Sequence, residues 1–87
     1  MRIFNIIIED KTKEKILYKH GITSYEIKKA LFNNPLILKT KDLRYLALSF
    51  YQKYITIVFE VKDNIALIIT AYPSSDAQRN LYKLKRG

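Results

Sequence analysis

The spacing of hydrophobic positions changes along this 87-residue chain from a helical period to an alternating one. Before the helical part, an isoleucine-rich run, Arg2–Ile8, predicts a first strand. The charged stretch after it predicts a helix that Asp10 or Thr12 caps. Gly21 is expected to end that helix, because glycine readily adopts the left-handed conformation common at helix C-termini.

The same helix carries the only histidine of the chain at its predicted C-terminal end. At about 100° per residue, Ile16, Leu17 and His20 fall on one face. A histidine near a helix C-terminus is favoured by the helix dipole and can bond the last carbonyl groups. Two interpretations of His20 therefore stay open, a helix-ending residue and a proton-transfer group.

Two further helices are predicted from capping boxes, in which side chains three residues apart exchange hydrogen bonds with the backbone. Thr23 and Glu26 form the first box, and the helix after it stops before Pro35. Ser75 and Gln78 form the second box, before a helix that runs toward the C-terminus. The expected buried stripes of these helices are Ile27, Ala30 and Leu31 in the first and Ala77, Leu81 and Leu84 in the second.

Four strands are expected between these two helices, in "PLILKT", "LRYLALSFY", "YITIVFEV" and "IALIITAY". The third is apolar on both faces and rich in β-branched residues, which favours a central position. Short links such as residues 62–64 favour an antiparallel meander. The predicted order is β-α-α-β-β-β-β-α. This is an α+β fold with helices packed on an antiparallel sheet, and residues 1–87 are expected to form a single domain.

Charge is the composition feature that changes this picture most. The chain has 16 Lys and Arg against 8 Asp and Glu, a formal net charge of +8. Such a charge favours a polyanionic partner such as RNA, although a lysine-rich surface also serves solubility. The sequence has no cysteine, which excludes disulfides, cysteine-ligated zinc and thiol catalysis. No apolar run approaches the roughly 20 residues that span a bilayer, and no signal peptide is visible, so a cytoplasmic protein without membrane association is expected.

The residues available for chemistry are mainly basic and aromatic. With two glycines and one histidine, the sequence has neither a phosphate-binding glycine loop nor ligands for structural zinc, so no metal or other cofactor is expected. Arginine and lysine bind phosphate, and tyrosine stacks on unpaired bases. Histidine or tyrosine can move a proton during attack of a 2′-hydroxyl on the adjacent phosphate. This inventory suits RNA, but a compact sheet with amphipathic edges also uses many tyrosines.

An ordered series of short motifs resembles the BrnT-like toxins of bacterial and archaeal toxin–antitoxin modules. The series spans about residues 9 to 82, and no single motif in it is decisive. In chain order it comprises Asp10, "KHGI" at residues 19–22, Glu26, Ala30-Leu31, Pro35, "RYLALS", "IVFE", "IITA" and "QRNLY" at residues 78–82.

The resemblance implies a ribonuclease toxin with a RelE-like fold. Such a toxin cleaves RNA without metal and is neutralised by a small antitoxin with a ribbon-helix-helix DNA-binding end. The expected assembly is either a homodimer or a toxin–antitoxin hetero-oligomer. The candidate catalytic residues, carried over from the matching motif positions, are His20, Arg44, Arg79 and Tyr82.

Further RNA contacts are expected from basic and aromatic residues around these positions. A row of lysines lines one face of the first helix at i, i+4 spacing, and it either follows an RNA backbone or forms a plain solvated face. Tyr72 is interpreted as a packing or stacking residue rather than as an acid. The candidate RNA-binding residues are Lys11, Lys15, Lys19, Tyr45, Tyr72 and Arg86.

Two positions depart from the resemblance. The family usually has Thr-Ala-Arg where this chain has Thr70-Ala71-Tyr72, and glutamate where it has Gln78. Neutral tyrosine cannot replace a phosphate-binding arginine, and glutamine keeps the helix cap but removes an acid–base group. The alternative to an active ribonuclease is therefore a catalytically decayed homologue that acts as a basic RNA-binding or protein-interaction module. A structural or regulatory protein is a third interpretation.

Overall fold

The computed structural model describes residues 5–86 and has the order of elements that the sequence predicts. The expected first strand is confirmed over Asn5–Ile7, and residues 2–4 of that prediction lie outside the described residues. The elements are β1 (Asn5–Ile7), α1 (Asp10–His20), α2 (Ser24–Leu31), β2 (Leu36–Lys39), β3 (Arg44–Phe50), β4 (Tyr54–Lys62), β5 (Ile65–Pro73) and α3 (Asp76–Lys85).

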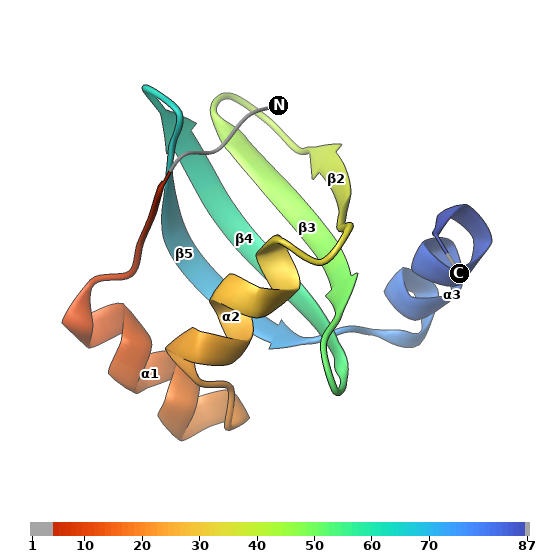
Figure 1. Cartoon of the computed structure of the whole chain (residues 1–87), viewed down its shortest axis with the longest axis horizontal. Coiled ribbons are helices and arrows are strands. Elements are labelled where there is room, and N and C mark those ends of the chain that lie inside the picture. Colours follow the sequence, from red (N-terminus) through yellow and green to blue (C-terminus); the bar gives the residue numbers. More distant parts are fainter. Residues whose placement is uncertain (1–4, 87) are drawn as a thin grey trace.

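The strands form one five-stranded sheet in the order β1-β5-β4-β3-β2 (Figure 1). Strands β2 to β5 make the expected antiparallel meander, and β4 has its predicted central position. The hairpin between β4 and β5 turns on Asp63 and Asn64, whose positive φ values of 54° and 65° suit a two-residue type I′ loop. Within residues 5–86, the sheet departs from a purely antiparallel one only at β1, which pairs with β5 in parallel, with Asn5 opposite Ile65.

Helices α1 and α2 cover one face of the sheet, whereas α3 lies apart from them beyond β3 (Figure 1). The hydrophobic core fills the space between the two helices and the sheet, and alternate strand residues point into it. We call the other side of the sheet the distal face. The distal face carries Arg44, Leu46, Leu48, Tyr54, Thr56, Val58, Glu60, Thr70 and Tyr72.

A β-bulge in β5 changes which of its residues face the helices. Ala66 and Ile68 are buried in the core, and the next buried core residue of this strand is Ala71. The pairing shifts at this point, because Val58 lies opposite Thr70 while the following residue of β4 lies opposite Ile68. One extra residue in β5 therefore turns its C-terminal part over, and Tyr72 lies on the distal face.

The local signals for the ends of α1 and α2 are confirmed in large part. Gly21 follows α1 with a φ of 66° and donates its backbone N–H to the carbonyl of Leu17. Both hydrogen bonds of the box formed by Thr23 and Glu26 are present at the start of α2. The predicted stripe of α2 is confirmed, and its buried residues are Ile27, Ala30 and Leu31.

The N-cap of α1 was predicted wrongly. Its N-cap is Glu9, without a side-chain cap, rather than Asp10 or Thr12. Asp10 is instead the first helical residue, where its negative charge is favoured by the helix dipole. Of the face that Ile16, Leu17 and His20 share, Ile16 enters the core, whereas Leu17 is 50% exposed.

Helix α3 begins at the predicted capping box of Ser75 and Gln78, but its packing differs from the prediction. None of its residues is buried, so the expected buried stripe of Ala77, Leu81 and Leu84 is wrong. Leu84 is 78% exposed. The physical reason is that α3 meets only one end of the sheet, along β3 and at side chains of β4 and β5, so that most of its circumference stays in solvent.

Candidate functional site

A cluster of polar and aromatic side chains lies where α1 and β5 end and where β4 and α3 begin. In it, the imidazole ring of His20 lies 6.4 Å from the ring of Tyr72, centroid to centroid, with an angle of 53° between the planes. His20 is exposed at the end of α1, whereas Tyr72 is half-buried on the distal face. Two residues that lie far apart in the sequence are thus brought together.

Helix α3 holds the hydroxyl group of Tyr72. The Nε2 atom of Gln78 donates a hydrogen bond to the Tyr72 oxygen, at 3.1 Å. The Oε1 atom of Gln78 accepts from the backbone N–H of Ser75 and from the hydroxyl of Thr56, both at 2.9 Å. Thr56 is fully buried, and its hydroxyl lies 2.7 Å from that of Ser74. The capping box of α3 therefore also fixes the position of Tyr72.

An aromatic group beside this network was not found from the sequence. The ring of Tyr54 lies 4.8 Å from that of Phe50 and 6.1 Å from that of Tyr82, in edge-to-face arrangements. The ammonium group of Lys83 lies 5.5 Å from the Tyr54 ring centroid, within the range of a cation–π contact. Strand alternation could have placed Tyr54 on the same face as Thr56, but the docking of α3 that adds Tyr82 has no local sequence signal.

The predicted catalytic residue Arg79 lies on α3, directly after Gln78. Its side chain is 45% exposed and forms an ion pair with Asp76, one helical turn earlier. An exposed pair of this kind contributes little to stability, so the guanidinium group stays accessible to another anion. The predicted RNA-binding residue Arg86 is exposed at the C-cap of the same helix.

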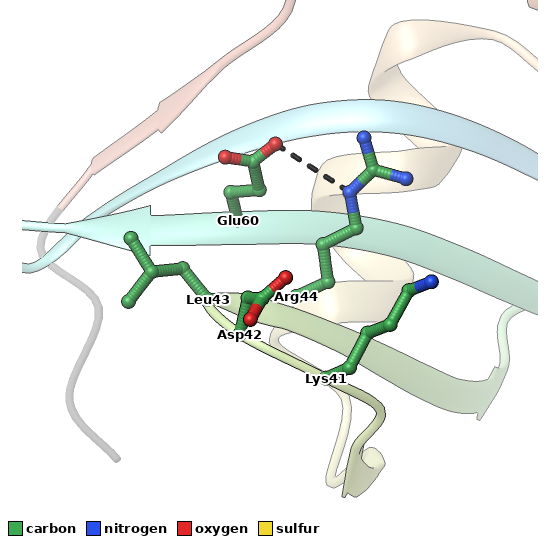
Figure 2. Close-up of a pocket in the computed structure, with 5 residues that line it drawn as sticks. All are labelled: Lys41, Asp42, Leu43, Arg44 and Glu60. Carbon is green, nitrogen blue, oxygen red and sulfur yellow. Dashed lines mark ion pairs between the residues drawn. The ribbon is translucent and has the colours of Figure 1, made fainter.

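The predicted catalytic residue Arg44 lies at the other end of the distal face. Its Nε atom is 3.6 Å from a carboxylate oxygen of Glu60, the residue opposite it on β4 (Figure 2). Glu60 and Thr56 are four residues apart on β4, a separation of about 13 Å in a strand. The structure therefore does not bring Arg44 into the cluster of His20. A surface pocket of about 420 Å³ at this end is lined by Lys41, Asp42, Leu43, Arg44 and Glu60 (Figure 2).

The three lysines predicted to bind RNA from α1 are all exposed. Lys11 and Lys15 line a surface pocket of about 270 Å³, whose other wall includes Thr70 of β5. Lys19 directly precedes His20. The lysine row thus runs beside β5 in the direction of the cluster.

The predicted RNA-binding residue Tyr45 lies on the opposite face of the sheet from Tyr72. Its ring stacks on that of Phe59, with centroids 5.7 Å apart and 22° between the planes. It is half-buried and packs against the hydrophobic core. These contacts explain Tyr45 as a packing residue, and its contact with RNA stays a prediction.

Two broader properties of the described part of the chain bear on the site. Among residues 5–86, no three His, Asp or Glu side chains gather closely enough to hold a metal ion. Over the same range, no helix combines the length and the apolar character needed to cross a bilayer.

The sequence matches no protein family model and no curated protein. Among solved structures, the crystal structure of the Brucella abortus ribonuclease toxin BrnT is similar, with a TM-score of 0.69 and 19% sequence identity. The match covers 84% of this chain and 99% of that chain. The chain has the BrnT fold. The fold expected from the BrnT-like motifs is thereby confirmed, and the chemistry has to be argued from the side chains.

Proposed function

We propose that this protein is a metal-independent endoribonuclease of the cytoplasm, a toxin neutralised by a small ribbon-helix-helix antitoxin. The observation that carries the proposal is the pairing of His20 with Tyr72, at 6.4 Å, on a fold shared with a ribonuclease toxin over 84% of the chain. The net charge of +8 supports a polyanionic substrate.

In the proposed reaction, the 2′-oxygen of one nucleotide attacks the neighbouring phosphorus atom. The new P–O2′ bond forms as the P–O5′ bond breaks, which leaves a 2′,3′-cyclic phosphate and a 5′-hydroxyl. His20 is suited to accept the 2′-hydroxyl proton, since its imidazole is exposed at the end of α1. Lys19 and Arg79 would stabilise the additional negative charge on the phosphate, and Tyr82, three residues after Arg79 on α3, would add a phenolic hydroxyl. Arg44, at about 13 Å along the sheet, would bind a different phosphate of the same strand.

The test is cleavage of a single-stranded RNA by the purified protein in the presence of EDTA. We expect products with 2′,3′-cyclic phosphate ends in mass spectra, and a loss of about 100-fold or more in Arg79→Ala. Asp76→Asn is the matched control, because it removes the ion-pair partner of Arg79 but keeps the guanidinium group. Intact RNA at high concentrations of wild-type protein would contradict the proposal.

The antitoxin is tested separately from the chemistry. A short ribbon-helix-helix protein encoded beside this one is expected to bind it and to suppress cleavage of the same RNA. Binding is measured by size-exclusion chromatography with light scattering, which also distinguishes a homodimer from a hetero-oligomer. Cleavage that continues in the presence of bound neighbour would contradict the toxin–antitoxin part of the proposal.

A second function is favoured by the neutral character of the pair formed by Tyr72 and Gln78. A protein without a charge at these positions could bind RNA or a partner protein and not cleave RNA. This candidate predicts RNA affinity that falls steeply with salt, without cleavage by the wild type. Cleavage that is found only in Tyr72→Arg would favour it over the first.

A further inference from the structure

We propose that Tyr72 is the proton donor of this site and that Gln78 is the positioning residue that directs its proton toward the substrate. This proposal rests on the ribonuclease function proposed above, and it replaces the stacking or packing role expected for Tyr72. It follows from the direction of the hydrogen bonds between β4, β5 and α3.

The orientation of the Gln78 amide is determined by a backbone group. The N–H of Ser75 can only donate, so the Gln78 atom 2.9 Å from it must be the carbonyl oxygen. The amide nitrogen then faces the hydroxyl oxygen of Tyr72, at 3.1 Å. A reversed amide would direct its NH2 group at another N–H, and the cap of α3 would be lost.

The same constraint orients the hydroxyl groups behind Gln78. Because the Gln78 oxygen only accepts, Thr56 donates its single hydroxyl proton to it, at 2.9 Å. Ser74 must then donate to Thr56 in the 2.7 Å contact between their oxygens. Thr56 is completely buried, which shields this contact from water. Donation therefore runs in one direction, from Ser74 through Thr56 and Gln78 to Tyr72, and bonds aligned in this way polarise one another.

The chain ends at the hydroxyl of Tyr72. Its oxygen already accepts a hydrogen bond from Gln78, so its own O–H points away from α3. Tyr72 is half-buried, and its ring lies 6.4 Å from that of His20, so a phosphodiester bound across the exposed edges of both rings meets a donor and an acceptor. The arrangement divides acid and base between two side chains.

The proton transfers balance over one cleavage. His20 takes the proton of the attacking 2′-hydroxyl, and Tyr72 gives its proton to the departing 5′-oxygen as the P–O5′ bond breaks. The amide N–H of Gln78 stabilises the phenolate that remains. The proton on His20 then returns to Tyr72 through solvent, which restores both groups.

A glutamate at position 78 would reverse this last hydrogen bond. Both carboxylate oxygens only accept, so Tyr72 would donate to Glu and turn its proton away from the substrate. An arginine at position 72 would instead pair with that glutamate through a charge-assisted bond. The two departures from the BrnT-like pattern are therefore coupled, and the neutral pair is an alternative arrangement rather than two independent losses.

The experiment measures kcat and KM for wild type, Tyr72→Phe, Gln78→Glu and the double variant Gln78→Glu/Tyr72→Arg. The probe is a 20-nucleotide single-stranded RNA in EDTA. We expect both single variants to lower kcat by about 100-fold or more with little change in KM, and the double variant to recover part of the loss. Tyr18→Phe is the matched control, because Tyr18 is 91% exposed and lies outside the cluster.

A second substrate separates proton donation from a merely structural effect. An RNA with sulfur in place of the bridging 5′-oxygen at the cleaved position has a leaving group that needs no protonation. Tyr72→Phe and Gln78→Glu are therefore expected to cleave it at close to the wild-type rate. If Gln78→Glu does not fold, Tyr72→Phe still decides the question, since it removes a single oxygen atom.

The outcomes distinguish the two proposals. If wild-type protein cleaves neither substrate, the proposed ribonuclease function is wrong, and the proton-donor role of Tyr72 is wrong as well. If wild type cleaves RNA while Tyr72→Phe and Gln78→Glu keep their kcat, the function stands and the proton-donor role is overturned. The proton-donor role is also overturned if Tyr72→Phe cleaves the sulfur substrate no faster than it cleaves ordinary RNA.

Discussion

The ammonium group of Lys53 lies 3.6 Å from the carboxylate of Glu26. The same ammonium group donates to the carbonyl oxygen of Gly21, at 3.3 Å. Lys53 directly precedes β4, whereas its two partners belong to the junction between α1 and α2. These contacts tie the end of α1, and with it His20, to the sheet that carries Tyr72.

Replacement of Glu26 by glutamine tests how much this junction depends on charge. The backbone N–H of Thr23, and then the charge of Lys53, hold the pKa of Glu26 below its usual 4.5. A carboxyl group with a lowered pKa contributes stability above its unfolded-state pKa and loses it as the pH falls through the folded-state pKa. Glu26→Gln is therefore expected to have a lower Tm than wild type at neutral pH, with the gap closing in acid. Thermal melts from about pH 7 down to about pH 2 measure the gap, and a constant gap would contradict the assignment.

Removal of Arg44 tests whether the far end of the distal face acts in binding rather than in chemistry. Because Arg44 lies about 13 Å from the cluster, Arg44→Ala should weaken RNA binding and reduce the salt slope by about 1, with a smaller effect on kcat than Arg79→Ala. Binding is measured by fluorescence anisotropy with a 2′-deoxy oligonucleotide, which cannot be cleaved by 2′-oxygen attack. Glu60→Gln is the matched control, since it releases Arg44 from its ion pair and should preserve or strengthen binding. A kcat loss in Arg44→Ala as large as in Arg79→Ala would assign Arg44 to the reaction instead.

Two leucine-to-alanine replacements test the packing of the distal face and of α3. Leu48 is 1% exposed in β3, so its truncation is expected to cost about 2–5 kcal/mol. Leu84 is 78% exposed on α3, and its truncation should change the free energy of unfolding by no more than about 0.5 kcal/mol. Urea denaturation of both variants checks the difference. A large loss in Leu84→Ala would mean that α3 packs on another surface in solution.

The local parts of the fold were predictable because their signals lie within a few residues. The box of Thr23 and Glu26 and that of Ser75 and Gln78 depend on side chains three positions apart, and both are present in the structure. Strand positions followed from alternation and short links, which also identified β4 as central. Helical spacing of apolar residues on α3 was misleading, since it does not show how much of a helix the sheet will cover.

The residues of the candidate site could be identified from the sequence, but their positions relative to one another could not. Tyr72 and Gln78 were singled out separately, but their hydrogen bond depends on the docking of α3 against β4 and β5. Arg44 and His20 were expected to act together, whereas strand register puts them at different ends of the sheet. Such relationships come from contacts between elements, which no short window of sequence records.

The bulge in β5 has a consequence for any comparison of this chain by alignment. Between Ile68 and Thr70, β5 has one residue more than β4. This extra residue determines which face of the sheet each later residue of β5 occupies. If the same residues alternated regularly after Ile68, with no bulge, Ala71 would take the place of Tyr72 on the distal face, and the tyrosine would be directed into the core. Deletion of Ile69, the extra residue, would remove the bulge and keep Tyr72 on the distal face, so a one-residue gap at this position is the difference expected from a relative whose strand is regular.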